Sequence, residues 1–308
     1  MTRYLDLTAA LAARIADGEL LPGATLPSVR ELAAAEGTTA TTVARAFHEL
    51  ADAGAIAVQP RRAARVTRHG VMAARALLRG GDPFRLAGSD DPALSILVAR
   101  VPDAVAPVGA SGSYRGLGAL WSGRADGAAL HLRHRSGEYN APFAAGLVGG
   151  RAPGAEPVLV HLWRREQGLI VPAGNPRGVG GVADLGTLRV ARRPTGTGTR
   201  TLLDRLLIES GVDPDAISGP TVELHLDVAL AVATGEADAG LGLRSAARPL
   251  GLDFVPLLWE PFQVATTREQ SGGVRPLIDG LGDDAVAERI AALGGYDLTG
   301  AGEVLDVP

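Results

Sequence analysis

Three stretches of the chain are rich in glycine and hydroxyl side chains, the groups that bind small anions. They lie at residues 88–92, 109–113 and 194–200. Glycine lets several backbone N–H groups point into one hollow, hydroxyls add donors, and the positive end of a following helix favours negative charge. The same residue types also form plain helix caps and turns. Together, the three stretches predict an anion-binding site that uses no lysine.

The composition excludes several classes of enzyme. All 30 residues of the combined lysine and arginine count are arginine, and the chain has no cysteine. A pyridoxal phosphate enzyme and a Walker-type phosphate loop both need a lysine, whereas thiol nucleophiles, disulfides and thiolate metal sites need cysteine. None of the six histidines lies in a recognisable nucleophile motif. We therefore expect a protein that is not an enzyme and that has neither cofactor nor metal site.

A second set of candidate residues is basic and lies near the N-terminus. Arg61, Arg62 and Arg65 are grouped there, although the whole chain carries a formal net charge of -4. Such a cluster indicates that only this part meets a polyanion, and an ordinary solvated surface is the alternative for any single arginine. Phosphate contacts supply affinity for DNA, and base contacts supply discrimination. We expect these arginines to contact phosphates or the minor groove.

The elements that position this cluster follow from the spacing of apolar residues. Helices are predicted over residues 7–17, 29–36 and 39–53, and two short strands over 55–58 and 64–67. Three helices and a basic hairpin form a winged helix-turn-helix, in which the third helix enters the major groove and the hairpin lies against backbone or minor groove. The sequence therefore predicts a DNA-binding head.

Local signals define the helix starts and the faces of the third helix. Ser28 and Glu31 have the spacing of a capping box, in which a hydroxyl and a carboxylate each bind a free backbone donor. Thr39 is expected to cap the third helix. Thr41 and Arg45 lie on its polar face and are the expected base readers. The buried stripe of the same helix is predicted to comprise Val43, Ala46, Phe47 and Leu50.

Three motifs of this head have a family-specific spacing. They are Leu20-x-Pro22-Gly23, Leu26-Pro27-Ser28-x-Arg30-Glu31-Leu32-Ala33 and Thr41-Thr42-Val43-x-Arg45-Ala46. Over residues 3–67 the chain resembles the head of the GntR family of bacterial transcription regulators, which implies a homodimer on a near-palindromic double-stranded DNA operator. The family usually has a glycine about where Arg61 stands. The resemblance and the pattern together place these residues near DNA: Arg30, Thr39, Thr41, Thr42, Arg45, His48, Arg61, Arg62 and Arg65.

The remainder of the chain is predicted to be an α/β domain. The head is assigned to residues 1–68, a linker helix to 69–82 and the larger domain to 83–308. In this domain strand-like runs alternate with helical ones, which indicates a parallel sheet. Small molecules bind in such folds beyond the carboxyl ends of strands, where the three anion-binding stretches fall. Strands are predicted at 84–88, 104–109, 127–132, 188–192, 221–224 and 237–242.

Further motifs occur in this domain. They are Gly168-Leu169-Ile170-Val171, Gly196-Thr197-Gly198-Thr199-Arg200 and Gly235-Glu236-Ala237-Asp238-Ala239-Gly240-Leu241-Gly242. Over residues 83–298 the chain resembles type II periplasmic-binding-protein domains of the molybdate-binding-like branch. The resemblance implies lobe one at 83–164 and 260–308, lobe two at 165–259, and a ligand between them. The ligand-binding residues expected on this basis are Ser89, Ser111, Ser113, Thr197, Gly198, Thr199, Arg200, His225 and Val228.

Three of these assignments have structural alternatives. Arg200 could instead form a salt bridge within lobe two, and His225 could be a capping and core histidine. The segment 163–166, Trp-Arg-Arg-Glu, lies near the expected hinge. Its charged side chains could contact the ligand, or they could form a solvent-exposed pair at the hinge.

These observations predict a one-component transcription regulator whose two-lobed domain closes on a small anionic effector. Molybdate or tungstate is the first candidate, and a pterin-like or other small organic ligand is the second. An enzyme fused to a DNA-binding head and an architectural DNA binder without effector are the alternatives. No apolar run approaches the length of a membrane span, and the N-terminus lacks an export pattern, so we expect a cytoplasmic protein without a membrane partner.

Overall fold

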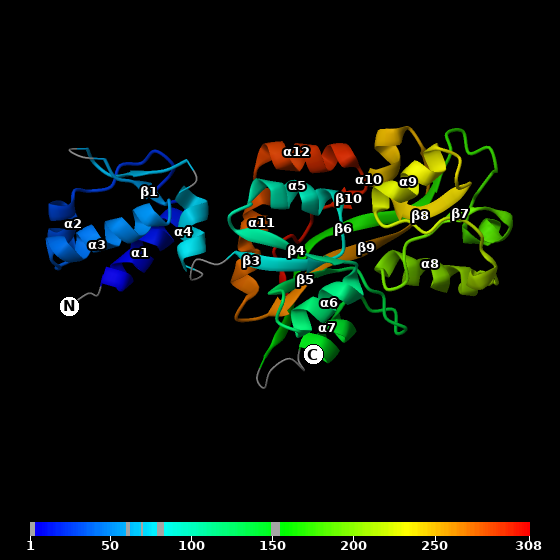
Figure 1. Ribbon diagram of the computed structural model, residues 1–308, viewed down its shortest axis with the longest axis horizontal. Coiled ribbons are helices and arrows are strands. Elements are labelled where there is room, and N and C mark those ends of the chain that lie inside the picture. The colour runs from blue at the N-terminus through cyan, green and yellow to red at the C-terminus, as the bar shows by residue number, and fades with distance from the viewer. Residues whose placement is uncertain (1–3, 60–61, 69, 79–82, 149–154) are drawn as a thin grey trace. The chain divides into compact units, whose positions relative to one another are not determined.

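The chain folds into two compact units. One comprises Met1–Phe84 with Val101–Ala106, and the other comprises Arg85–Arg100 with Pro107–Pro308. The computed structural model describes residues 4–59, 62–68, 70–78, 83–148 and 155–308 (Figure 1).

Three helices form the core of the first unit, as the apolar spacing predicts. Leu11, Leu32 and Leu50, one from each helix, are almost wholly buried in a single cluster. The predicted stripe of the third helix is confirmed, because all four of its residues are buried. The helices are α1 (Tyr4–Ala16), α2 (Val29–Ala35) and α3 (Ala40–Asp52).

The starts of α2 and α3 have the predicted caps. The Ser28 hydroxyl accepts a hydrogen bond from the Glu31 backbone N–H at 3.3 Å, and the Ser28 N–H donates to the Glu31 carboxylate at 2.8 Å. The Thr39 hydroxyl accepts from the Thr42 N–H at 3.2 Å. Side-chain caps of this kind satisfy backbone donors that the helix leaves free. Both capping predictions are therefore confirmed.

A short hairpin and a fourth helix complete this unit. Strands β1 (Ile56–Ala57) and β2 (Arg65–Val66) pair antiparallel. Helix α4 (Gly70–Leu78) packs against α1, with Ala74 buried in the common core. The Arg75 guanidinium donates to the Ala16 carbonyl at the end of α1, at 2.7 Å. The helix predicted as a linker is thus packed onto the head.

The second unit is built on one mixed sheet. Its order is β4-β3-β5-β9-β6-β8-β7. β3 and β5 are parallel, as are β7 and β8, whereas β9 is antiparallel to β5 and β6, and β6 is antiparallel to β8. The predicted parallel sheet is therefore corrected to a mixed one. The strands are β3 (Phe84–Gly88), β4 (Val105–Ser111), β5 (Gly127–Leu130), β6 (Pro157–Val171), β7 (Val190–Ala191), β8 (Ala239–Leu243) and β9 (Asp253–Thr267).

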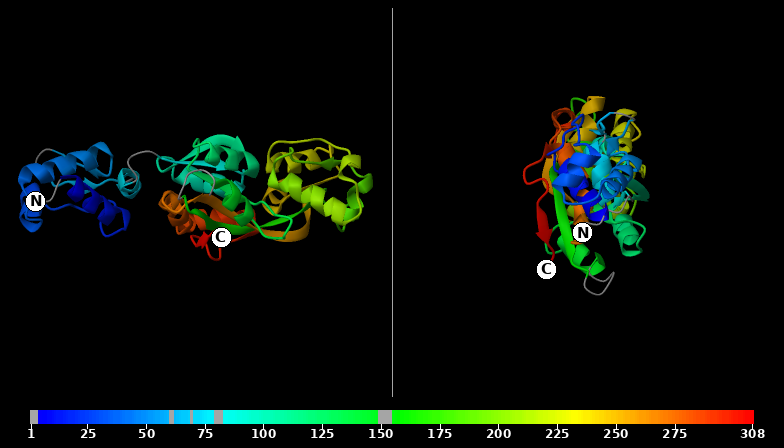
Figure 2. Two further views of the ribbon diagram at one scale, coloured as in Figure 1. Left: turned by 90° about the horizontal axis from the view of Figure 1, so that it is seen from below. Right: turned by 90° about the vertical axis from the view of Figure 1, so that its left-hand side faces the viewer.

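The two longest strands join two lobes. β6 and β9 have 15 residues each and pair from Pro157 with Thr267 to Val171 with Asp253. β9 pairs with β5 near one end, and β6 pairs with β8 near the other. Both strands therefore pass from one lobe into the other, as the views from two sides show (Figures 1 and 2). This is the two-lobed fold that the sequence predicts.

Helices cover both faces of each lobe (Figure 1). In the first lobe α5, α11 and α12 lie on one face and α6 and α7 on the other; in the second lobe α9 and α10 lie opposite α8. The helices are α5 (Pro92–Arg100), α6 (Ser113–Trp121), α7 (Ala141–Val148), α8 (Gly198–Glu209), α9 (His225–Ala233), α10 (Arg244–Ala247), α11 (Arg275–Leu281) and α12 (Asp284–Leu293). Two short strands, β10 (Tyr296–Asp297) and β11 (Val304–Asp306), pair with β6. Short segments of 3-10 helix are η1 (Val182–Thr187), η2 (Pro214–Ala216), η3 (Arg248–Leu250) and η4 (Ser271–Val274).

One predicted strand is absent from the described second unit. At residues 221–224 the chain makes an isolated bridge between Thr221 and Arg192 and then turns into α9. The Asp227 carboxylate accepts a hydrogen bond from the Leu224 N–H at 2.9 Å, so this stretch forms the N-terminal cap of α9 and not a strand. Within the described part of the chain, no helix combines the length and the apolar character that crossing a membrane requires.

Candidate functional site

The exposed face of α3 is the candidate base-reading surface of the head. Thr41, Arg45 and His48 are exposed there, as the sequence predicts for a DNA-facing helix. The Arg45 guanidinium carbon lies 4.2 Å from the centroid of the Tyr4 ring, within the range of a cation–π contact. The His48 Nε2 atom lies 3.2 Å from the Asp52 carboxylate. Arg45 is therefore held beside α1 by an aromatic face.

Two other predicted DNA contacts have structural partners within the head. The hydroxyls of Thr39 and Thr42 are hydrogen-bonded to each other at 2.9 Å, in addition to the cap that Thr39 provides. Arg30 is exposed on α2. A hydroxyl that caps a helix can still accept a further hydrogen bond, because it has two lone pairs.

The hairpin presents two exposed arginines. The Arg62 guanidinium donates to the Gln59 side-chain carbonyl at 3.3 Å, and Arg65 lies on β2 with its side chain exposed. These two residues, with Ala57, Gln59 and Ala63, line a hollow of about 590 Å³. Arg61, the third arginine predicted to bind DNA, lies outside the described residues.

A second candidate site lies where the two lobes meet. The start of α6 and the start of α8 are in contact there, since a side chain at Gly112 would lie 3.3 Å from Thr197. The His131 ring lies against the backbone of Gly198, where a Cβ atom would approach it to 2.5 Å. Ser113, the first residue of α6, accepts the His131 N–H at 3.4 Å. Two helix N-termini therefore converge on one buried histidine.

Arg165, on β6, is fully buried and links several residues of this inter-lobe site. Its Nη1 atom donates to Asp91 at 2.7 Å, and its Nε atom donates to Glu260 at 2.8 Å. Gln167, two residues along the same strand, donates to Glu260 at 2.9 Å and to the Thr199 hydroxyl at 3.3 Å. The two lobes are thus linked through side chains of the crossing strands.

Asp90 makes a second polar link between the lobes. Its carboxylate accepts the Arg193 guanidinium at 2.7 Å and the His225 backbone N–H at 3.2 Å. Burial by itself raises the pKa of Asp90, but the neighbouring His225 and Arg193 hold it well below its ordinary value. Burial lowers the pKa of His225 well below its ordinary value.

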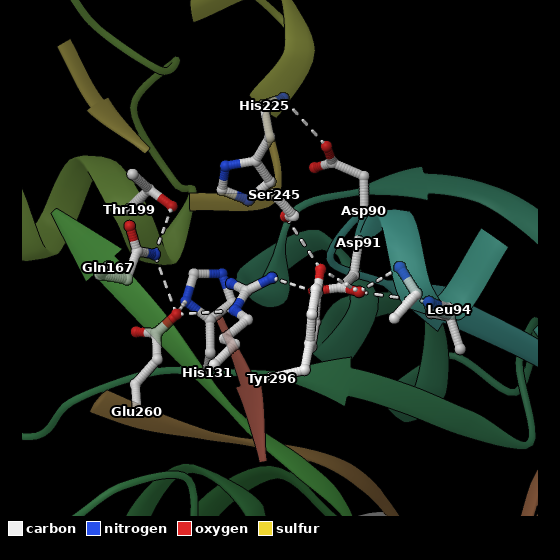
Figure 3. A network of polar contacts seen from close by, with 12 residues as sticks. Asp90, Asp91, Leu94, His131, Gln167, Thr199, His225, Ser245, Glu260 and Tyr296 are labelled. Carbon is white, nitrogen blue, oxygen red and sulfur yellow. Dashed lines mark hydrogen bonds and ion pairs between the residues drawn. The ribbon is translucent and has the colours of Figure 1, made fainter. Parts of the chain in front are cut away.

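Asp91 joins the inter-lobe site to the start of α5. Its Oδ1 atom accepts the N–H groups of Ala93 and Leu94 at 2.8 and 3.2 Å, which caps the helix. The Tyr296 hydroxyl donates to the same oxygen at 3.1 Å and lies 3.1 Å from the Ser245 hydroxyl (Figure 3). Burial raises the pKa of Asp91 despite its ion pair. A rigid helix cap therefore supports the Arg165 contact.

Glu260 and His131 form the other side of the site. The His131 Nδ1 atom lies 3.1 Å from the Glu260 carboxylate. Burial by itself raises the pKa of Glu260, but His131 and Arg165 together with hydrogen bonds lower it to about 2. Burial lowers the pKa of His131. The His131 ring stacks on Phe262, which stacks on Trp163 at 5.3 Å. These stacked rings therefore pack against one side of the polar network.

Several buried polar atoms of this network have no hydrogen-bond partner. They are Arg165 Nη2, Gln167 Oε1, Arg193 Nε and both ring nitrogens of His225. A buried polar atom without a partner costs roughly 1–3 kcal/mol. Arg165 and Gln167 lie on the crossing strand β6, and Arg193 and His225 lie in the second lobe where it meets Asp90 of the first. A small molecule or water between the lobes is therefore the natural partner for these atoms. They are the strongest structural sign of a ligand site in the described part of the chain.

The predicted ligand residues divide into three groups. Ser89, Ser113, Thr197, Gly198, Thr199 and His225 lie at the inter-lobe site, and their roles as ligand contacts stay predictions. Arg200 pairs with Asp204 at 2.7 Å, the structural alternative for this residue, and Val228 lies in the core of the second lobe. Ser111 belongs to β4, but its side chain lies outside the described part.

Sequence reasoning did not single out Gln167, Arg193 or Glu260. Gln167 and Glu260 are buried polar residues in the two long, mostly apolar strands. The signal for Glu260 is a single charged residue between apolar neighbours, whereas Gln167 ends the polar run 164–167. The sequence leaves open a solvated hinge pair at residues 163–166, and the complete burial of Arg165 corrects that alternative. Among the described residues, no group of three metal-ligating side chains lies close enough to hold a metal ion.

A winged-helix head and a two-lobed fold in one chain define the class of DNA-binding regulators that carry a ligand-binding domain. Residues 96–281 match the family described as PBP superfamily domain, and residues 3–66 match the family described as bacterial regulatory proteins, gntR family. The first match covers more than half of the chain. The chain belongs to the PBP superfamily and carries a GntR-type head.

The chain also resembles individual proteins. It is 32% identical over 200 residues to the uncharacterized protein YvgK of Bacillus subtilis (strain 168), a match that covers 63% of this chain and 63% of that protein. A probable transcriptional regulator from Pseudomonas aeruginosa is 18% identical, with a TM-score of 0.45 over 96% of this chain and 98% of that one. An H2O2-bound mutant of OxyR from Corynebacterium glutamicum is 14% identical, with a TM-score of 0.47 over 93% of this chain and 94% of that one.

Proposed function

We propose that the protein is a one-component transcription regulator whose effector binds between the lobes. The homodimer would bind a near-palindromic operator through its two DNA-binding heads. Effector binding would change the affinity of the homodimer for that operator. The observation that carries the proposal is the set of unpartnered buried atoms on the crossing strand β6 and on the face of the second lobe that meets Asp90, in a chain with a GntR-type head. An effector changes operator affinity by its differential binding to the two states, typically ~1–3 kcal/mol.

The polar contacts between the lobes distinguish a closed state, in which they are formed, from an open state, in which they are broken. Asp90 reaches Arg193 and the start of α9 from the other lobe, so opening the lobes breaks a buried ion pair. A ligand that satisfies Arg193 Nε and the His225 ring would favour the state in which the lobes are together. The effector thus acts by biasing closure, and we propose that closure re-spaces the heads.

The effector is proposed to be a small molecule with hydrogen-bond acceptors. Most of the unpartnered atoms are N–H donors, and the N-termini of α6 and α8 add partial positive charge. Three carboxylates, Asp90, Asp91 and Glu260, already outnumber the two guanidinium groups of the site. This balance weighs against a dianion such as molybdate or tungstate and favours the organic alternative. We propose no enzymatic step.

Operator binding measured with and without candidate effectors tests the proposal. A binding duplex is selected from random DNA with the full chain, and its affinity is followed by fluorescence anisotropy during titration with molybdate, tungstate, sulfate and phosphate. Calorimetry measures direct binding, and a Kd weaker than ~1 mM for all four oxyanions excludes them as effectors. Organic acceptors are then titrated in the same way. A chain that binds no selected duplex contradicts the proposed function.

A matched pair of variants tests the site itself. Arg193→Met removes a buried guanidinium that links the lobes, whereas Arg177→Met removes a largely exposed one from the same lobe. We expect Arg193→Met to abolish the effector response, because it removes a donor of the inter-lobe site, while the unchanged head still binds the selected duplex. Arg177→Met should respond like the wild type. An unchanged response in Arg193→Met contradicts the site.

A further inference from the structure

A mostly apolar hollow opens beside the inter-lobe site, in the first lobe. It has a volume of about 490 Å³ and lies between α5 and strands β3 and β4. Its apolar walls include Leu86, Leu94, Val98 and Val108, and its polar end is formed by Ser89 and Asp90. Ligand pockets of proteins have volumes of roughly 300–1,000 Å³ and mainly apolar walls. The hollow is therefore of ligand size and character.

The hollow and the inter-lobe site share one segment of the chain. Ser89, Asp90 and Asp91 line the hollow, and Asp90 also contacts Arg193 and His225 in the second lobe. Arg193 and His225 are buried and do not line the hollow themselves, so Asp90 is the residue that separates the hollow from the unpartnered Arg193 Nε atom and the His225 ring. The two regions therefore meet at the Asp90 carboxylate.

The shape and charge of this surface disfavour a bare oxyanion. A tetrahedral oxyanion has no apolar part and gains nothing from walls of leucine and valine. The polar end already holds a surplus of carboxylates over guanidinium groups, so a second added negative charge meets repulsion at close range. A single negative charge can still accept hydrogen bonds from the N–H donors of the site that lack partners.

We propose that the hollow between α5 and strands β3 and β4 binds the apolar part of an amphipathic organic monoanion whose head group lies at Arg193 and His225. This inference rests on the proposed function, because it names the class of effector for the same inter-lobe site. The carboxylate of such a molecule accepts hydrogen bonds from the unpartnered donors. Its hydrocarbon part removes the leucine and valine side chains from water.

A chain-length series tests the inference. Straight-chain carboxylates from acetate to octanoate are titrated into the full chain by calorimetry at fixed pH and salt. Burial of a CH₂ group contributes ≈ 0.8 kcal/mol, so affinity is expected to rise about fourfold for each added CH₂ until the hollow is full. Affinity that is independent of chain length, or the absence of binding by any member, overturns the inference.

A pair of tryptophan substitutions locates the binding. Ser95 is exposed on α5 and lines the hollow, so Ser95→Trp fills the hollow without altering the core. Ser210 is exposed at the end of α8 in the other lobe and serves as the matched control. Thermal unfolding of both variants verifies folding. We expect Ser95→Trp to reduce octanoate affinity at least tenfold to the level of acetate, and Ser210→Trp to bind like wild type. Equal octanoate affinity in both variants overturns the inference.

Operator binding separates this inference from the proposed function. If octanoate binds with the expected chain-length dependence but leaves operator affinity unchanged, the hollow is confirmed as a binding site and the regulatory function fails. If an oxyanion changes operator affinity while the carboxylates show no chain-length dependence, the regulatory function stands and the hollow inference fails.

Discussion

The carboxylate of Asp90 lies 2.7 Å from the guanidinium of Arg193, although Asp90 follows β3 in the first lobe and Arg193 follows β7 in the second. Only the two crossing strands join these lobes covalently in the described sheet. The ion pair is therefore a direct non-covalent link across the interface between the lobes, and its removal tests how strongly that interface is held.

Asp90→Asn should destabilise the second unit by about 3 kcal/mol, because it leaves the buried Arg193 guanidinium without its charged partner. Urea unfolding followed by tryptophan fluorescence measures the change. The double variant Asp90→Asn with Arg193→Met removes both charges and should recover part of the loss. A double variant whose loss equals the sum of the two single losses would show that the two residues do not interact.

Glu260→Gln should flatten the acid dependence of stability. The pKa of Glu260 is about 2 in the folded chain against an ordinary value of 4.5, so its ionisation stabilises the fold above pH 4.5. This contribution, on the order of 3 kcal/mol, is lost as pH falls from 4.5 to 2. Unfolding free energies measured across that range should decline less steeply in the variant, whereas identical slopes contradict the assignment.

Arg45→Ala should abolish discrimination between the selected operator and a scrambled duplex, since Arg45 is a predicted base reader on the exposed face of α3. Tyr4→Ala removes the aromatic face that holds Arg45 and should reduce discrimination by a smaller factor. Thr41→Ala, on the same face, is the comparison for loss of a neutral side chain. Anisotropy titrations with both duplexes measure the ratios, and full discrimination in Arg45→Ala rejects the helix assignment.

Arg62→Ala should weaken binding to the operator and to the scrambled duplex by similar factors. Arg62 is exposed on the hairpin and is predicted to contact phosphate, which carries no sequence information. The slope of log affinity against log salt should fall by about one in magnitude. A change confined to the operator would assign Arg62 to base reading instead.

The sequence predicts those parts of the fold that depend on local chemistry. The capping box of Ser28 and Glu31, the buried stripe of α3 and the strand at Phe84–Gly88 all form as expected. Each depends on residues a few positions apart. The predicted DNA contacts lie mostly on exposed helix or hairpin surface, but their contact with DNA stays a prediction.

The inter-lobe network could not be predicted in the same way. Arg165 and Glu260 are 95 residues apart, and their contact requires the antiparallel pairing of β6 and β9. A periodic pattern does not reveal which distant strand lies beside which. The expected parallel sheet was wrong for this reason, because a strand that returns antiparallel through the centre has the same local apolar pattern as one reached by a crossover.

Helix α4 has a practical consequence for exchanging sensors between regulators. Ala74 is buried among the head's apolar side chains, and Arg75 caps the last turn of α1. A fragment cut after the hairpin would therefore expose to water the surface of α1 that α4 covers. A transplantable module therefore extends through Leu78, and a chimaera joined at residue 68 would graft an incomplete DNA-binding part onto its new receptor.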